Sequence, residues 1–336
     1  MTTKDIIVVG SSAGGVDALS RLCASLPADL PAAVCVAQHL SPSAKSMLPL
    51  LLDRAGPLKA LTPVDGQAIE HGYIYVAPPD HHLLVRPGKL LVRRGPFENR
   101  TRPAVNALFR SAAISYGSRV IGVVLTGLLD DGTDGLIAIK AAGGTSVVQD
   151  PDEAEWPSMP RNALKRDHVD SVMRLSEMGT LLTALTREIA GPSIPLPQEY
   201  TTEDLIAAQE FAVMETEIVT PGHASHFSCP DCGGVLNQLE TGNELRFRCQ
   251  VGHAFTPLGL ANAQNEELER ALAIAVRTHR DRIRLFAKMW ENAEQRGLPH
   301  AVVRWREASA ESEQMIEVLE QATAALRKPP MGDRDG

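Results

Sequence analysis

The sequence predicts an α/β protein: a doubly wound, mostly parallel sheet with a β-hairpin, then a small Cys- and His-containing module and a helical hairpin. Strand-like apolar runs alternate with helical spacing through the first half. Later, Cys and His occur in close pairs, and two long stretches repeat apolar residues every three or four positions. We expect domains at 1–190, 191–225 (a proline-rich linker with a short helix), 226–258 and 259–328, the last a helical hairpin or coiled coil.

Length and composition fit a globular protein. The 336 residues, 44% hydrophobic and 22% charged, suffice for one α/β domain and something smaller. The formal net charge of −8 argues against nucleic-acid binding. No apolar run approaches the roughly 20 residues of a membrane helix. The chain enters its first strand at Ile6 without a signal-peptide pattern, so we expect a cytoplasmic protein without membrane insertion.

The first strand leads into a turn that is typical of an exposed serine. The apolar run Ile6–Val9 enters small residues, and helical spacing follows to Leu26. Gly10 and Gly14 bracket Ser12 as G-x-S-x-G, which presents a serine on a sharp strand-to-helix turn. A plain glycine-rich turn with a capping serine is the alternative. A dinucleotide fingerprint is disfavoured because Ser12 replaces its second glycine.

A second apolar strand, 32–37, ends at Gln38-His39. A strand, a crossover helix and a strand of this length make a parallel unit, so His39 should lie on the same sheet edge as Ser12. A histidine at a strand end is more often structural. Its position beside an exposed serine favours a functional role.

A third strand-like run, 120–126, ends in a glycine-rich loop that contains Asp130, Asp131 and Asp134. These carboxylates could bind a hard cation, form turns and helix caps, or orient His39. In the last case Ser, His and Asp would follow three strands of one sheet.

A basic stretch runs from Arg86 to Arg110 and begins in a predicted β-hairpin, His82–Arg86 and Lys89–Arg93 around Pro87-Gly88. It contains seven basic residues against one acid, Glu98. The excess could form a docking face for an acidic partner or simply a solvated hairpin.

Two close residue pairs in the second half have zinc-ligand spacing. They are Cys229 with Cys232, and Cys249 with His253. C-x₂-C and C-x₃-H pairs can close a tetrahedral, structural zinc site in a zinc-ribbon-like module. Reduced thiols without metal are the alternative, and His223 and His226 are competing ligands. Cys23 and Cys35 fall in a predicted helix and strand and should be buried.

The C-terminal stretch predicts two long helices. Apolar residues recur every three or four positions over 268–290 and 302–326, and Gly297-Leu298-Pro299 interrupts them. An antiparallel hairpin and an intermolecular coiled coil both fit this pattern, and the internal hairpin is the more economical.

Several motifs follow one another in the first half of the chain. They are Gly10–Gly15, Gln38-His39, Gly72–Asp80, Arg102–Phe109, Leu125–Gly132 and Met159–Arg161. Together they resemble the catalytic domain of the chemotaxis protein-glutamate methylesterase family. The resemblance implies that Ser12 is the nucleophile, His39 the general base and Asp131 the carboxylate behind it. We predict backbone N–H groups of Ala13 and Leu128 as oxyanion donors.

The resemblance also implies the reaction and its partners. The family hydrolyses glutamate methyl esters on cytoplasmic chemoreceptor helices, releases methanol and deamidates particular glutamines, without a cofactor for catalysis. The cognate methyltransferase or kinase is a further candidate partner. A non-catalytic scaffold that binds a receptor or kinase is the alternative function.

Two features depart from the family pattern. Members commonly carry a phospho-receiver domain ahead of the esterase, for which the sequence leaves no room, so we expect a different mode of control. Asn106 stands where the family frequently has aspartate.

Overall fold

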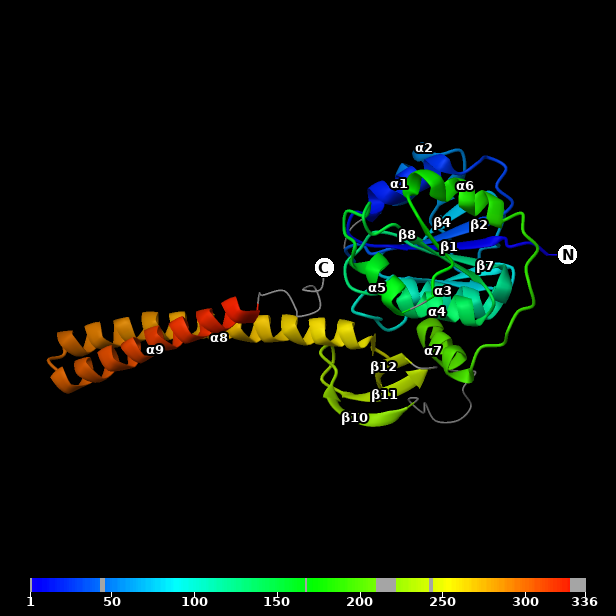
Figure 1. Cartoon of the computed structure of the whole chain (residues 1–336). Coiled ribbons are helices and arrows are strands. Elements are labelled where there is room, and N and C mark those ends of the chain that lie inside the picture. The colour runs from blue at the N-terminus through cyan, green and yellow to red at the C-terminus, as the bar shows by residue number, and fades with distance from the viewer. Residues whose placement is uncertain (1, 43–45, 167, 210–221, 242–243, 327–336) are drawn as a thin grey trace. The chain divides into compact units, whose positions relative to one another are not determined.

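The computed structural model describes residues 2–42, 46–166, 168–209, 222–241 and 244–326. The chain divides into two compact units, Met1–Leu260 and Ala261–Gly336. The first unit contains a large sheet with its helices and a small antiparallel sheet (Figure 1). The second contains most of two long helices.

Seven strands form a parallel sheet in the order β3-β4-β2-β1-β7-β8-β9. In its centre, Ile6 of β1 pairs with Ala33 of β2 on one side and with Val120 of β7 on the other. These three strands are buried along their whole length, as expected for strands covered on both faces. The strands are β1 (Ile6–Ser11), β2 (Ala33–Gln38), β3 (Lys59–Leu61), β4 (Tyr73–Val76), β7 (Val120–Val124), β8 (Thr145–Gln149) and β9 (Ser171–Met173).

Helices cover both faces of the large sheet (Figure 1). Successive residues of β1 point to opposite faces, so Ile7 and Val9 belong to one apolar core and Ile6 and Val8 to the other. The first core includes α1 (Gly15–Ser25), α2 (Leu48–Ala55) and α6 (Leu175–Leu185). The second includes α3 (Val105–Tyr116), α4 (Thr133–Ala141) and α5 (Ser158–Arg166). The predicted doubly wound fold is confirmed.

The predicted hairpin is also confirmed. β5 (His82–Arg86) and β6 (Lys89–Arg93) pair antiparallel, and the Val85 N–H donates to Ser111 Oγ of α3 at 2.9 Å. A short 3₁₀ helix, Gly117–Arg119, follows α3.

The arginines of the basic stretch form ion pairs within the chain. The pairs are Arg86–Asp204, Arg93–Asp65, Arg94–Asp80, Arg102–Asp80, Arg100–Asp231 and Arg110–Glu98. These pairs account for most of the local charge excess and do not favour the docking face.

The first unit also contains α7 (Gln198–Ala208) and a four-stranded antiparallel sheet. That sheet contains β10 (His223–Ser228), β11 (Val235–Thr241), β12 (Glu244–Cys249) and β13 (Ala254–Phe255). We call residues 223–256 the metal module, because they include the predicted zinc ligands.

The two long helices, α8 (Pro257–Gln295) and α9 (Pro299–Leu326), form the internal hairpin favoured by the sequence. The rings of Phe286 and Trp305 stack at 5.6 Å between centroids. Ion pairs join Arg306 to Glu294 at 2.6 Å and Arg280 to Glu320 at 3.0 Å. No helix in the described ranges is both long and apolar enough to cross a bilayer.

Candidate active site

Three neighbouring strands bring the three predicted catalytic residues together. Ser12 follows β1, His39 follows β2, and Asp131 lies in the loop after β7. Their side chains meet because parallel strands end at one edge of the sheet. Ser12 Oγ lies 3.1 Å from His39 Nδ1, and His39 Nε2 lies 2.7 Å from Asp131 Oδ2.

The two nitrogens of His39 can take different roles in this arrangement. With Asp131 ionised, Nε2 carries the hydrogen and donates it to the carboxylate. The lone pair on Nδ1 then accepts the hydrogen bond from the Ser12 hydroxyl. This tautomer leaves Nδ1 ready to remove the hydroxyl proton.

The start of α3 stabilises the charge of Asp131. The backbone N–H of Val105 donates to Oδ2 at 2.7 Å, and that of Asn106 donates to Oδ1 at 3.1 Å. These N–H groups lack partners within the helix, and the helix dipole also favours an anion there. These two bonds hold the carboxylate in place. Its Oδ2 can still accept a hydrogen bond from His39 Nε2.

The turn that carries Ser12 depends on backbone contacts. The Ser12 N–H donates to the Thr126 carbonyl at 3.0 Å, and the Gly15 N–H donates to the Ser12 carbonyl at 2.9 Å. Gly14 has a φ of +72°, in the left-handed region that glycine adopts without a steric penalty. The glycines therefore permit the sharp turn that the sequence predicts.

The predicted oxyanion donors border the serine. A Cβ on Gly127 would lie 2.8 Å from the Cβ of Ser12, so the backbone leading to Leu128 passes close to Ser12. Within the described part of the chain, neither the Ala13 nor the Leu128 N–H donates a hydrogen bond. Their role as oxyanion donors stays a prediction.

The sequence motif contains Gln38 but gave it no role, and in the structure Gln38 joins the two turns that carry Ser12 and His39. Its Nε2 donates to the backbone carbonyls of Ser12 at 2.7 Å and His39 at 3.0 Å. Its Oε1 accepts from Ser11 Oγ at 2.6 Å. The available signal was a polar residue as the last residue of an otherwise apolar, buried strand.

The other carboxylates of the loop have different contacts. Asp130 Oδ1 accepts from Thr256 Oγ1 at 2.9 Å, and its Oδ2 lies 3.5 Å from Arg166. Burial and the neighbouring Asp134 raise the pKa of Asp130 to about 7 and outweigh these two contacts. Among the described residues, the loop carboxylates do not form a group that could hold a metal.

Asn106 joins α3 to the loop that carries Asp131. Its side-chain carbonyl accepts from the backbone N–H groups of Gly132 at 3.0 Å and Gly135 at 2.8 Å. Since an aspartate oxygen could accept the same two bonds, the departure from the family pattern preserves this connection.

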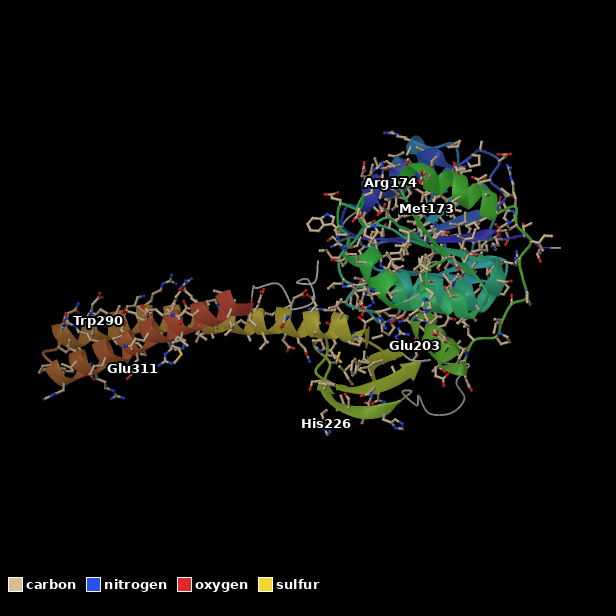
Figure 2. All side chains as sticks on the ribbon, in the orientation of Figure 1. Met173, Arg174, Glu203, His226, Trp290 and Glu311 are labelled. Carbon is tan, nitrogen blue, oxygen red and sulfur yellow. The ribbon has the colours of Figure 1, made fainter. Side chains whose placement is uncertain are left out.

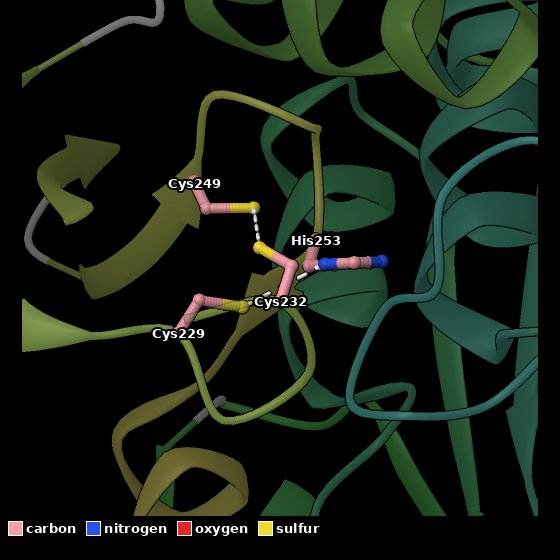
Figure 3. A group of neighbouring side chains, drawn as sticks. All are labelled: Cys229, Cys232, Cys249 and His253. Carbon is pink, nitrogen blue, oxygen red and sulfur yellow. Dashed lines mark hydrogen bonds between the residues drawn. The ribbon is translucent and has the colours of Figure 1, made fainter. Parts of the chain in front are cut away.

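The predicted zinc ligands form a compact cluster (Figure 3). The ligand atoms of Cys229, Cys232, Cys249 and His253 all lie within 4.8 Å of one another, and this cluster could hold a metal ion. The alternative ligands His223 and His226 are not part of it. The pKa of the Cys249 thiol is lowered by its hydrogen bond with Cys229 despite burial, with His253 and Cys232 contributing, so a thiolate is favoured there.

A buried charge network attaches the metal module to the rest of the first unit. Glu203 lies on α7 (Figure 2). It pairs with Arg246 of β12. Arg248 of β12 lies 3.7 Å from Glu98, which also pairs with Arg110 at 2.6 Å. Burial alone would raise the pKa of Glu98, but Arg110, Arg248 and Arg246 lower it below its usual range.

Comparisons with known proteins match the first half of the chain. The CheB methylesterase family model matches residues 7–182, a range that ends before Cys229. A protein-glutamate methylesterase/protein-glutamine glutaminase 2 of Methanosarcina mazei is 34% identical over 194 residues, covering 55% of this chain and 53% of that protein. A putative protein-glutamate methylesterase/protein-glutamine glutaminase of Leptospira interrogans is 35% identical over 182 residues, covering 54% of this chain and 94% of that protein.

A solved structure shares the fold of this half. The Thermotoga maritima CheB methylesterase catalytic domain is 32% identical, with a TM-score of 0.52, and the match covers 55% of this chain and 100% of that chain. The chain spans about half the length of the Methanosarcina relatives that it matches.

Proposed function

Because the chain belongs to the CheB methylesterase family, we propose that it hydrolyses γ-methyl esters of glutamate side chains in a protein. Ser12, His39 and Asp131 would be the catalytic residues. The observation that carries this proposal is the hydrogen-bonded line from Ser12 Oγ through both ring nitrogens of His39 to Asp131. The alternative role for Ser12, a helix cap, does not require a histidine at its hydroxyl.

The chemistry would proceed in two steps. Ser12 Oγ attacks the ester carbonyl carbon while His39 Nδ1 takes the hydroxyl proton. The C–O bond to the methoxy group then breaks, methanol leaves with that proton, and an acyl-serine remains. A water molecule, deprotonated by Nδ1, attacks the acyl carbon and releases the glutamate and Ser12. Asp131 stabilises the imidazolium in both steps.

The carbonyl oxygen becomes negatively charged in each tetrahedral intermediate. The N–H groups of Ala13 and Leu128 are our candidates to bind it, and each such donor typically lowers the barrier by about 3 kcal/mol. This stabilisation needs no metal at the serine.

We propose methyl-accepting chemoreceptor helices as the substrate. The relatives are named protein-glutamate methylesterase/protein-glutamine glutaminase, and the same serine chemistry would release ammonia from a glutamine amide. The ester and amide substrates differ only in the leaving group.

The test is methanol release from a methylated chemoreceptor fragment. Ser12→Ala should abolish it, whereas Ser20→Ala, on the adjoining helix, should leave it unchanged. Circular dichroism should show that both variants are folded. Methanol release that persists in Ser12→Ala would refute the mechanism. Binding of the fragment without turnover in the unmodified protein would favour the scaffold alternative.

We further infer that the cysteine and histidine cluster holds a structural zinc ion. Tetrahedral ligands at ordinary zinc distances leave about 3.8 Å between two sulfurs and about 3.6 Å between a sulfur and a nitrogen. Cys232 Sγ and Cys249 Sγ are 3.7 Å apart, and Cys229 Sγ and His253 Nδ1 are 3.6 Å apart. Four protein ligands would leave no position for a substrate, so this zinc would support folding.

A further inference from the structure

A short segment, Phe97–Thr101, connects the metal module to the candidate active site. On its module side it pairs with the residues that follow the ligand His253. The Ala254 N–H donates to the Phe97 carbonyl at 3.1 Å, and the Asn99 N–H donates to the Ala254 carbonyl at 2.8 Å. The segment is therefore attached directly beside one of the four predicted ligands.

The other ligand pair also contacts this segment. Arg100 forms an ion pair at 3.1 Å with Asp231, which lies between Cys229 and Cys232. The Phe97 ring stacks on His253, with 6.4 Å between ring centroids. The segment is thus held near both ligand pairs, Cys229 with Cys232 and Cys249 with His253. The position of one pair relative to the other therefore determines the path of the segment.

The backbone of the segment is strained in a way that requires such support. Asn99 and Arg100 have φ values of +48° and +60°, in the left-handed region. Asparagine tolerates this conformation better than most residues, whereas it costs a residue such as Arg100 about 1 to 2 kcal/mol. The Asn99 side chain accepts from the Thr256 N–H at 2.9 Å, so contacts with the module stabilise the strained pair.

At its other end the segment approaches Asp131. Thr101 Oγ1 lies 3.5 Å from Asp131 Oδ2, and the chain continues to Val105, whose N–H donates to the same oxygen. Buried His82 bonds to both flanks of the segment, with Nε2 at 2.8 Å from the Pro96 carbonyl and Nδ1 accepting from the Ala104 N–H at 3.2 Å. Thus His82 of the hairpin fixes the residues on either side of the segment. The left-handed pair Asn99 and Arg100 is instead fixed by contacts with the metal module.

We propose that metal binding by the Cys229, Cys232, Cys249 and His253 cluster positions Asp131 through the segment Phe97–Thr101. The inference rests on the proposed function, since it assigns the cluster control over the same catalytic residues. With the metal bound, the two ligand pairs keep the segment in its left-handed path, and Thr101 and the start of α3 stay placed around the carboxylate. Without it, the segment relaxes and Asp131 loses its fixed position behind His39. Asn99 is the positioning residue at the centre of this connection.

The first experiment compares full-length protein loaded with zinc, stripped by a chelator and reloaded. Amide hydrogen exchange follows residues 97–106, and a fluorophosphonate probe reports Ser12 reactivity. A misplaced catalytic group costs on the order of 100-fold in rate for about 1 Å. We expect stripping to raise exchange over 97–106 and to lower the maximum labelling rate at least tenfold. The half-saturating probe concentration should stay within about twofold, and zinc should restore both readouts.

The outcomes separate this inference from the proposed function. If the zinc-loaded protein is not labelled at Ser12, the proposed function fails, and exchange over 97–106 still decides whether the metal controls the segment. If Ser12 is labelled equally fast with and without zinc, the inference is overturned. An exchange increase confined to residues 223–256 would overturn it as well.

A second experiment keeps the zinc and breaks the connection. Asn99→Gly tolerates the left-handed φ but removes the acceptor for the Thr256 N–H. The loss of one such bond should reduce the maximum labelling rate by about fivefold at unchanged zinc content. Gln209→Gly is the matched control, because Gln209 is also left-handed, with a φ of +57°, and lies outside the segment. Equal rates in the two variants would overturn the proposed connection.

Discussion

Asp130 and Asp131 are adjacent in the sequence, but only Asp131 contacts His39, at 2.7 Å. Asp131→Asn would place an amide beside Nε2 and favour the tautomer with its hydrogen on Nδ1, which cannot accept the Ser12 proton. We expect kcat to fall by about 10,000-fold, the effect of this change in other serine hydrolases. Asp130→Asn keeps an acceptor oxygen for Thr256 and should retain most activity. Steady-state methanol release measures both, and similar losses would contradict the assignment of Asp131.

Asp130 also predicts a pH dependence of stability. Its pKa is raised from 3.8 to about 7 by burial and by Asp134. At a pH between these two values, the Asp130 carboxyl is protonated in the folded state and ionised in the unfolded state. The resulting stabilisation is complete below about pH 4 and disappears as the pH rises through about 7. Over the whole pH range it amounts to about 4 kcal/mol.

Urea unfolding at pH 5 and pH 8 measures this effect. Asp130→Asn cannot titrate, so its unfolding free energy should decline less between the two pH values than that of the unmodified protein. The comparison cancels the contributions of other titrating groups. Parallel declines in the two proteins would show that Asp130 titrates normally.

Among the elements, the metal module gives a direct prediction. Purified protein should contain one zinc ion per chain, since its four candidate ligands form a single group among the described residues. Cys229→Ser should lose the metal and lower the melting temperature. Cys23→Ser is the control: burial in α1 raises the pKa of this thiol to about 12, and it lies outside the cluster. Metal analysis and thermal unfolding provide the measurements, and full zinc content in Cys229→Ser would contradict the ligand assignment.

Local patterns predict the elements around the active site well. The run Ile6–Val9 and its glycine turn specify a buried strand and a sharp turn, and parallel pairing then dictates that Ser12 and His39 share an edge. The hairpin around Pro87-Gly88 has the predicted bounds for the same reason, because its turn residues and apolar runs are adjacent in sequence.

Contacts between distant residues could not be predicted in this way. Glu98 and Arg248 are 150 positions apart, and each alone suggests a solvated surface residue, whereas the fold buries both. The left-handed Asn99 and Arg100 also lack a glycine signal, because contacts from the metal module stabilise them. The sequence therefore indicates the sheet edge that carries Ser12, His39 and Asp131 but not the contacts that support it.

At the scale of the whole molecule, the metal module and the hydrolase fold lie in one compact unit, Met1–Leu260. The ion pairs of Glu203 and Glu98 with Arg246 and Arg248 are buried, and removing one partner of such a network typically costs about 3 to 5 kcal/mol. We therefore expect the hydrolase fold and the module to unfold together. The domain boundaries at 190 and 226 stay predictions from the sequence.

The helical hairpin should contribute little to the stability of the first unit. Its Phe286–Trp305 stack and its Arg306–Glu294 ion pair join α8 to α9 within the second unit. A chain that ends at Arg270 keeps the first turns of α8 and should match the full chain in Ser12 labelling and in the melting temperature of the zinc-loaded first unit. Calorimetry and probe kinetics provide the comparison. A loss of more than about 3 °C, equivalent to about 1 kcal/mol, would show that the hairpin supports the hydrolase unit.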